Sequence, residues 1–256
     1  MRMDLTDDAI ASLEWATLDA VAPAEQESVG SWLIPYDNST IGRATSAVPL
    51  RHHDIETSTL TATEARYAQH GLQAAFRIAD VPGLVSLTAA LTAMGYRATQ
   101  PTLVQVSDMT PLLALKTSAP VTIDPVVSAS WASVYTAKGF DPVDGAHRVQ
   151  ALSRSKHIVY ATVSRDGEAL AAGTASMSRG WVGIHGMRTV TTARGQGLAA
   201  SILQGLAQTA VQNQYQRAFL QVEEGNLAAL ALYRRAGFTT AWRYHYWRKP
   251  KGICTP

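Results

Sequence analysis

The chain has 256 residues, of which 46% are hydrophobic and 16% charged, so it is apolar enough to bury a core and too apolar to be disordered. Its 22 Lys and Arg side chains nearly balance 20 Asp and Glu, and a formal net charge of +2 gives no support for nucleic-acid binding. The single cysteine, Cys254, excludes an intrachain disulfide framework, and the sequence has neither a signal-peptide pattern at its start nor an apolar run long enough to span a membrane. We therefore expect a soluble, cytoplasmic protein.

The first half alternates helical and strand-like segments. Apolar residues at helical spacing predict a helix from Ile10 to Ala20. The elements expected after it are strands at 30–36 and 43–50, a helix over 61–70, a strand at 73–79, a helix over 82–94 and a strand at 101–107.

The second half begins with helical segments and continues with three strands in hairpin rhythm. A helix through Trp131 and Tyr135, a second over 145–155, and strands at 157–164, 168–177 and 181–189 are expected. Leu198, Ile202 and Leu206, at intervals of four, predict the next helix. A strand at 217–224, a helix over 226–237 and an aromatic strand at 241–248 complete the chain.

Two segments of similar sequence indicate an internal repeat. QAAFRIA leads through a helix and GY to TLVQV, and QRAFLQV leads through a helix and GF to YHYWR. The aromatic residue after the glycine lies 20 positions beyond Phe76 in the first segment and 19 beyond Phe219 in the second. The first copy has Leu91 in place of Tyr233, and RHHDIE around Arg51 in place of a glycine-rich turn. We therefore expect the first half to be a scaffold.

The glycine-rich turn lies in the run TARGQGLAASIL. Glycine begins a helix poorly unless the backbone itself must approach a partner. Because a helix N-terminus presents unpaired N–H groups and a partial positive charge, the natural partner is a phosphate. The spacing fits neither G-x-x-x-x-G-K-[ST] nor G-x-G-x-x-G. It does fit R-x-x-G-x-A, through Arg194, Gly197 and Ala199.

Two motifs, in order, resemble the GNAT superfamily of N-acetyltransferases. In that superfamily R-x-x-G-x-A holds the coenzyme A pyrophosphate. The run FLQVEEGNLAALALYRRAGF, from Phe219 to Phe238, is similar to the superfamily's strand five, Asn-led helix four and L-Y-x-x-x-G-F ending. The resemblance covers roughly residues 111–250. It implies an α/β fold of mixed sheets, with a degenerate GNAT-like domain at 1–110 and a complete catalytic domain at 111–256, similar to a bacterial group of tandem GNAT-like proteins.

The resemblance implies acetyl-CoA as the acyl donor and no metal. Carried onto this sequence, the pyrophosphate turn is Arg194, Gly195, Gln196, Gly197, Leu198 and Ala199. The residues expected along the coenzyme arm are Met187, Thr189, Val190, Asn226, Ala229 and Tyr233. Backbone N–H groups from Met187 to Val190 are also expected to stabilise the oxyanion.

Tyr233 is the first candidate for the chemistry. It matches the superfamily's tyrosine that donates to the coenzyme sulfur. A free phenol, with a pKa near 10, is a weaker acid than a thiol near 8.5, so we expect hydrogen bonding with a modest effect; packing on an amphipathic helix is the alternative. Asn226 precedes the same helix as a predicted N-cap.

The general base has several candidates. His185 lies on the strand at 181–189, on the same face as Met187 and Thr189 by alternation, and its ordinary pKa near 6.5 suits a base at neutral pH. Its position relative to the motif is similar to that of a histidine in arylalkylamine acetyltransferases, although a packed strand histidine is the alternative. Glu223 and Glu224 are rivals, and a water chain is a third route.

These observations predict an acyl-CoA-dependent N-acyltransferase that moves acetyl to a small-molecule primary amine by direct transfer in a ternary complex. The alternative is a non-catalytic acyl-CoA-binding or assembly protein. A nucleic-acid or membrane partner is not expected, and the chain is a monomer or homodimer. His52 and His53 are expected on the surface and not in a metal site. The run from Tyr244 to Trp247 is a buried closing strand or a lining of the acceptor pocket. The basic residues around it are expected to form a solvated end and not a nucleic-acid site: Arg243, Arg248, Lys249 and Lys251.

Overall fold

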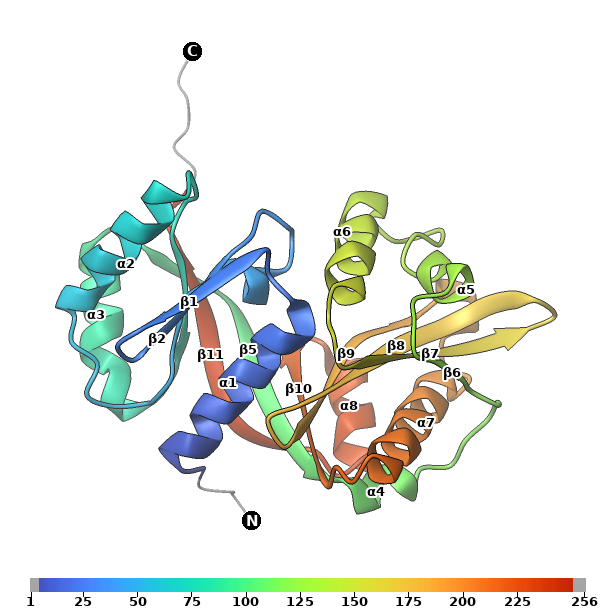
Figure 1. Cartoon of the computed structure of the whole chain (residues 1–256). Coiled ribbons are helices and arrows are strands. Elements are labelled where there is room, and N and C mark those ends of the chain that lie inside the picture. The colour runs from blue at the N-terminus through green and yellow to red at the C-terminus, as the bar shows by residue number, and fades with distance from the viewer. Residues whose placement is uncertain (1–4, 251–256) are drawn as a thin grey trace.

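The computed structural model describes residues 5–250, which form a small sheet beside a large one (Figure 1). The strands are β1 (Glu25–Val29), β2 (Trp32–Tyr36), β3 (Val48–Pro49), β4 (Ala75–Ala79), β5 (Arg97–Asp108), β6 (Thr122–Asp124), β7 (Ile158–Arg165), β8 (Glu168–Ser178), β9 (Trp181–Thr189), β10 (Arg217–Glu223) and β11 (Thr239–Arg248). The small sheet has the order β1-β2-β3, and the large sheet has the order β4-β11-β5-β10-β9-β8-β7-β6. This is the mixed α/β architecture that the sequence predicts.

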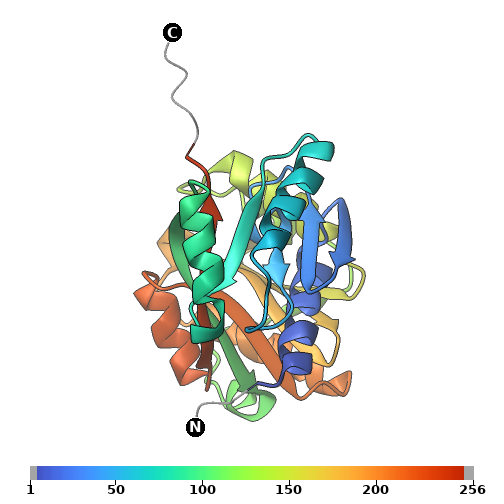
Figure 2. The same cartoon turned by 90° about the vertical axis from the view of Figure 1, so that its left-hand side faces the viewer.

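Helices cover both faces of the large sheet. They are α1 (Asp7–Val21), α2 (Ser58–Gln69), α3 (Val85–Ala93), α4 (Met109–Leu113), α5 (Ala129–Ser133), α6 (Pro142–Ser153), α7 (Leu198–Gln212) and α8 (Leu227–Arg235). Three short 3₁₀ turns are η1 (Gly42–Ala44), η2 (Pro82–Leu84) and η3 (Thr191–Ala193). Figure 2 shows α1 and α8 on opposite sides of the sheet.

The two halves of the chain share the large sheet by exchanging their last strands. β5, which ends the first half, pairs antiparallel with β10 of the second half. β11, which ends the second half, pairs antiparallel with β4 of the first half and also with β5. The order strand–helix–strand therefore occurs twice, as β4-α3-β5 and β10-α8-β11, in agreement with the predicted repeat. The sheet is continuous across the boundary predicted at residue 110.

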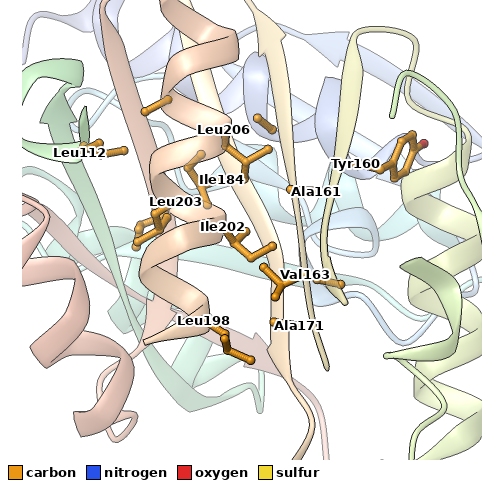
Figure 3. Close-up of a cluster of buried hydrophobic side chains, with 14 of the residues drawn as sticks. Leu112, Tyr160, Ala161, Val163, Ala171, Ile184, Leu198, Ile202, Leu203 and Leu206 are labelled. Carbon is orange, nitrogen blue, oxygen red and sulfur yellow. The ribbon is translucent and has the colours of Figure 1, made fainter. Parts of the chain in front are cut away.

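One apolar face holds α7 on the sheet (Figure 3). Leu198, Ile202 and Leu206 are fully buried there, at the predicted intervals of four. Each such side chain contributes about 1.5–3 kcal/mol on burial. The helix comes close because β8 has Gly173 beneath it, where a Cβ atom would lie 2.8 Å from Ile202 Cγ2. This packing places the N-terminus of α7 at the end of β9.

The opposite face is covered by α1, which polar contacts hold in place. Gln221 Nε2 of β10 donates to Thr17 Oγ1 at 3.0 Å. Arg77 of β4 and Glu14 form an ion pair at 2.6 Å, with side chains 0% and 1% exposed. Because removing one partner of a buried pair leaves an uncompensated charge, this pair ties α1 to the exchanged sheet.

The first half differs from the sequence prediction in three places. Where a strand over 43–50 was expected, the structure has η1 followed by the two-residue β3. The backbone of η1 lies directly against the Tyr246 ring, because a Cβ atom added to Gly42 would be only 2.8 Å from two of the ring carbons. The polar strand β1 was not predicted, since its residues are mostly exposed and show no apolar alternation. His52, expected on the surface, is partly buried with its ring 4.9 Å from that of Trp242, and this burial lowers its pKa to about 4.

Candidate active site

The glycine-rich turn joins β9 to α7 and leaves its backbone open. Gly195 and Gly197 have φ angles of +77° and +78°, a conformation that glycine adopts without steric cost. No atom lies within 4 Å of the position that a Cβ on Gly195 would take, whereas a Cβ on Gly197 would lie 3.1 Å from Ser118 Oγ. The turn therefore requires glycine for its conformation, and the space beside Gly195 is open.

The N–H groups of this turn have no partner in the part of the chain that the structure describes. Backbone donors at residues 194–199 reach no backbone acceptor there, and α7 has no side-chain cap. The side chain of Gln196 is held by Arg165, which donates to Gln196 Oε1 at 3.2 Å, and the exposed Arg194 lies at the edge of the turn. The start of this 15-residue helix therefore presents unpaired N–H groups, the kind of donor set that binds phosphate in proteins.

The parallel strands β9 and β10 separate beside the turn. Their last paired residues are Ile184 and Leu220, although β9 continues to Thr189 and β10 to Glu223. Beyond this point, backbone groups of both strands that would otherwise pair with each other face a gap in the hydrogen-bonded ladder. An extended ligand with amide groups could bond to such strand edges.

A bulge lies in β9 at the start of this gap. The register with β8 shifts between residues 172 and 174, so Gly186 and Met187 together lie opposite Gly173. Gly186 has a φ of +62°, and a Cβ there would lie 2.4 Å from Tyr135 Oη, whose hydroxyl donates to the Gly186 carbonyl oxygen. The bulge therefore depends on a glycine.

Two sequence predictions for this segment are wrong. His185 and Met187 do not share a face: the His185 ring lies 5.6 Å from that of Phe219, whereas Met187 packs with the cluster under α7. The extra residue between them reverses the alternation. The N–H group of Val190 is not free for an oxyanion, because it donates to the Leu170 carbonyl at 2.9 Å.

Helix α8 carries Asn226 and Tyr233. Asn226 Oδ1 accepts a hydrogen bond from the Ala229 N–H at 3.2 Å, which confirms the predicted N-cap. Tyr233 is 7% exposed, and its hydroxyl has no hydrogen-bond partner among residues 5–250. Burial raises the pKa of Tyr233 to about 12, against the lowering influence of the Arg43 charge. Tyr233 is therefore a neutral phenol with an unused donor.

His185 is placed less favourably for proton transfer. It is 3% exposed, and within the described chain neither ring nitrogen has a hydrogen-bond partner. Burial, followed by the positive charge of Arg43, lowers its pKa well below 6.5, so the ring is neutral and accepts a proton weakly. Its role as a base stays a prediction.

A cavity of about 180 Å³ lies where β10 and β11 meet η1, and Glu223 lines it. Tyr244 and Tyr246 form part of the wall, so the aromatic strand is both buried and cavity-lining. Arg43 and Gln221 also line the cavity, and the sequence analysis identified neither, since Arg43 lies in a segment predicted as a strand. A larger groove of about 810 Å³ lies at the opposite end of β8, beside Ser178, away from the glycine turn.

Within residues 5–250, no group of His, Cys, Asp or Glu side chains could hold a metal ion, and no helix is long and apolar enough to cross a membrane. Arg248, expected in a solvated basic end, lines the cavity. Cys254 and Lys251 lie outside the described residues.

The mixed sheet, with parallel strands that separate beside an open glycine turn, makes this fold GNAT-like. The sequence matches the family described as "Probable histone acetyltransferase Rv0428c C-terminal" over residues 7–247, and the chain belongs to that family.

Known proteins resemble the chain to different extents. It is 37% identical over 82 residues to the Bacillus subtilis (strain 168) protein named "Uncharacterized N-acetyltransferase YobR"; the match covers 32% of this chain and about a third (33%) of that relative. A GCN5-related N-acetyltransferase from Kribbella flavida has the same fold, with a TM-score of 0.70, 16% identity and coverage of 96% of this chain and 97% of that one. A tandem GNAT protein from the clavulanic acid biosynthesis pathway has a TM-score of 0.62, 11% identity and coverage of 94% and 96%. At these identities, the solved structures show the fold alone.

Proposed function

We propose that the protein transfers an acetyl group from acetyl-CoA to the primary amine of a small molecule in a ternary complex. The observation that carries the proposal is the run of unpaired N–H groups at residues 194–199, at the N-terminus of α7 and beside the opening between β9 and β10. Arg194 and these N–H groups would hold the pyrophosphate. Thr189 and Asn226 would contact the coenzyme arm in the gap, and the acetyl group would enter the sheet between the two strands.

The acceptor must lose a proton before it reacts. An alkyl amine with a pKa near 10.4 is about 3.4 units from neutrality at pH 7, which costs about 4.6 kcal/mol. The amine nitrogen then attacks the acetyl carbonyl, so that an N–C bond forms, the C–S bond breaks and one proton leaves the nitrogen. Glu223 lines the cavity and is the base that an amine there would meet, whereas the buried His185 does not line it.

The leaving thiolate meets the other candidate residue. With a pKa of about 12, Tyr233 is some 3.5 units less acidic than a thiol near 8.5, so complete proton transfer would cost about 5 kcal/mol. Tyr233 would therefore stabilise the developing thiolate by donating a hydrogen bond. The thiolate takes its proton from solvent after the bond has broken.

Two other functions compete with this proposal. A non-catalytic protein would bind acetyl-CoA without transfer, and the unused hydroxyl of Tyr233 argues against it. The family description names a histone acetyltransferase, which favours a protein lysine as the second candidate acceptor. The cavity, however, is lined by Arg43, Arg148 and Arg248 against one acid, Glu223, which is unfavourable for a tail rich in lysine and arginine.

One experiment separates the three. The full chain is incubated with acetyl-CoA and either a pool of small primary amines or purified histones, and released thiol and acetylated product are measured. Thiol release that requires a small amine supports the proposal, and Tyr233→Phe should slow it. Thiol release that occurs with histones but not with small amines would assign the protein-directed function. Binding of acetyl-CoA without thiol release in either reaction would support the non-catalytic alternative.

A further inference from the structure

We infer that the acceptor carries a carboxylate, which Arg43 binds in the cavity between the two halves, so that the substrate class is a small amino acid or related amino-carboxylate. This inference rests on the proposed acetyl transfer. It gives the first half, which was expected to be only a scaffold, the residue that selects the substrate.

The charges around the cavity leave Arg43 without a partner. Among residues 5–250 no carboxylate is paired with its guanidinium; the charged or polar groups that influence it most are Tyr246, Tyr244 and two other arginines, Arg148 and Arg77. Both of those arginines are already paired, Arg148 with Asp144 at 2.7 Å and Arg77 with Glu14 at 2.6 Å. The Arg43 side chain is partly buried, and a guanidinium in such a place without a counter-ion would gain free energy from a bound anion.

Arg248 is a second arginine of the cavity that has no carboxylate partner in the described chain. Its guanidinium stacks on the Tyr246 ring at 4.5 Å and donates weakly to Gln100 Oε1 at 3.3 Å. The one acid of the wall, Glu223, already accepts a hydrogen bond from Gln100 Nε2 at 3.0 Å. The cavity therefore has an excess of positive charge.

The backbone holds Arg43 in a defined place. η1 lies so close to Tyr246 that a Cβ on Gly42 would be 2.8 Å from the ring, and Ser46 Oγ donates to the Gly42 carbonyl at 2.7 Å. Thr40, just before the turn, donates to Asp144 of α6 at 2.9 Å. The guanidinium fork thus extends from a fixed turn, a geometry suited to a planar carboxylate.

The location of Arg43 connects the cavity to the reaction. Its charge lowers the pKa of His185, which lies on β9 next to the last residue that pairs with β10, and it also acts on Tyr233 of α8. A cavity of about 180 Å³ is smaller than the roughly 300–1,000 Å³ of most ligand pockets, so it suits a small acceptor. Positive neighbours also disfavour an ammonium ion, and so would lower the pKa of an amine bound beside them.

The test uses the full chain and matched pairs of acceptors, each an amino acid and its carboxamide. We expect the wild type to prefer the acid by about 10- to 150-fold in kcat/KM, the value of a charge-assisted hydrogen bond. Arg43→Gln should remove this preference through a higher KM for the acid. Its affinity for acetyl-CoA should stay unchanged, and Arg179→Gln, at an exposed position of a different surface, is the control for loss of an arginine.

The outcomes separate this inference from the proposed function. If the wild type binds acetyl-CoA and acetylates acids and amides equally, or if Arg43→Gln keeps the preference, the carboxylate site is refuted while acetyl transfer stands. If acetyl-CoA does not bind, the proposed function is refuted. Direct calorimetric titration of the amino acids then tests the site separately: binding that Arg43→Gln abolishes supports it, and no binding to the wild type refutes it.

Discussion

Replacing Tyr233 with phenylalanine removes one hydroxyl from the site and little else. The hydroxyl has no hydrogen-bond partner in residues 5–250, and the ring packs edge-on to Phe238 at 5.8 Å, a contact that phenylalanine keeps. The folded protein should therefore be as stable as the wild type. What is lost is one hydrogen bond to the departing thiolate, worth about 1.5–3 kcal/mol for a charged acceptor, or a 10- to 150-fold lower kcat.

The assay is thiol release at saturating acetyl-CoA from pH 7 to pH 10. Because the pKa of Tyr233 is about 12, the phenol remains protonated over this range, and its ionisation should cause no loss of wild-type activity toward high pH. Acetyl-CoA affinity should be unchanged in the variant. Tyr160→Phe is the matched control, since that hydroxyl donates to the Leu152 carbonyl at 2.9 Å and its loss affects stability away from the site.

A wild-type kcat in Tyr233→Phe would refute the assigned role. The role would also be refuted if wild-type activity fell near pH 9 and this fall were absent in Tyr233→Phe. The Tyr233 hydroxyl would then be acting as an acid with a much lower pKa than its burial allows.

Two further predictions follow from the cavity and from the first half. If Glu223 is the base, Glu223→Gln should lower kcat by at least about 100-fold. Glu224→Gln is the control and should keep the wild-type kcat, because the Glu224 carboxylate lies 3.5 Å from Arg243. A wild-type kcat in Glu223→Gln would exclude Glu223 as the base. The pKa of His52 is about 4 when folded and near 6.5 when unfolded, so its contribution to stability is present above pH 6.5 and is lost as the pH falls toward 4. His52→Phe should reduce the loss of unfolding free energy between pH 7 and pH 4.5 by up to about 2.5 kcal/mol, measured with urea; an unchanged pH dependence would contradict this.

The sequence predicted the parts of the site whose signals are local. A glycine pair before a helix, an asparagine at a helix start and apolar residues at intervals of four each follow from the chemistry of a few neighbouring residues. Leu198, Ile202 and Asn226 accordingly have the predicted surroundings. The repeat also pointed to the strand–helix–strand units, although their exchange of last strands depends on pairing between residues more than one hundred positions apart, as for Leu103 and Arg243.

Features that depend on the fold were missed. The bulge at Gly186 inserts one residue into β9, and a two-residue alternation cannot indicate where such an insertion falls. Arg43 has ordinary neighbours in the sequence, and only the approach of η1 to Tyr246 brings it to the cavity. β6 has only three residues, Thr122–Asp124, too few for a periodic pattern.

We propose that the N–H groups at residues 194–199 bind the pyrophosphate of acetyl-CoA. The most direct measurement is calorimetric titration of acetyl-CoA into the full chain, Gly195→Asp and Gly71→Asp. Both glycines have positive φ, +77° and +67°, and open space around the position of a Cβ, so the two variants carry the same backbone strain and charge. We predict saturable binding to the wild type and to Gly71→Asp and its loss in Gly195→Asp, where a carboxylate would face the phosphates. Equal binding by all three proteins, or no binding by the wild type, would contradict the account.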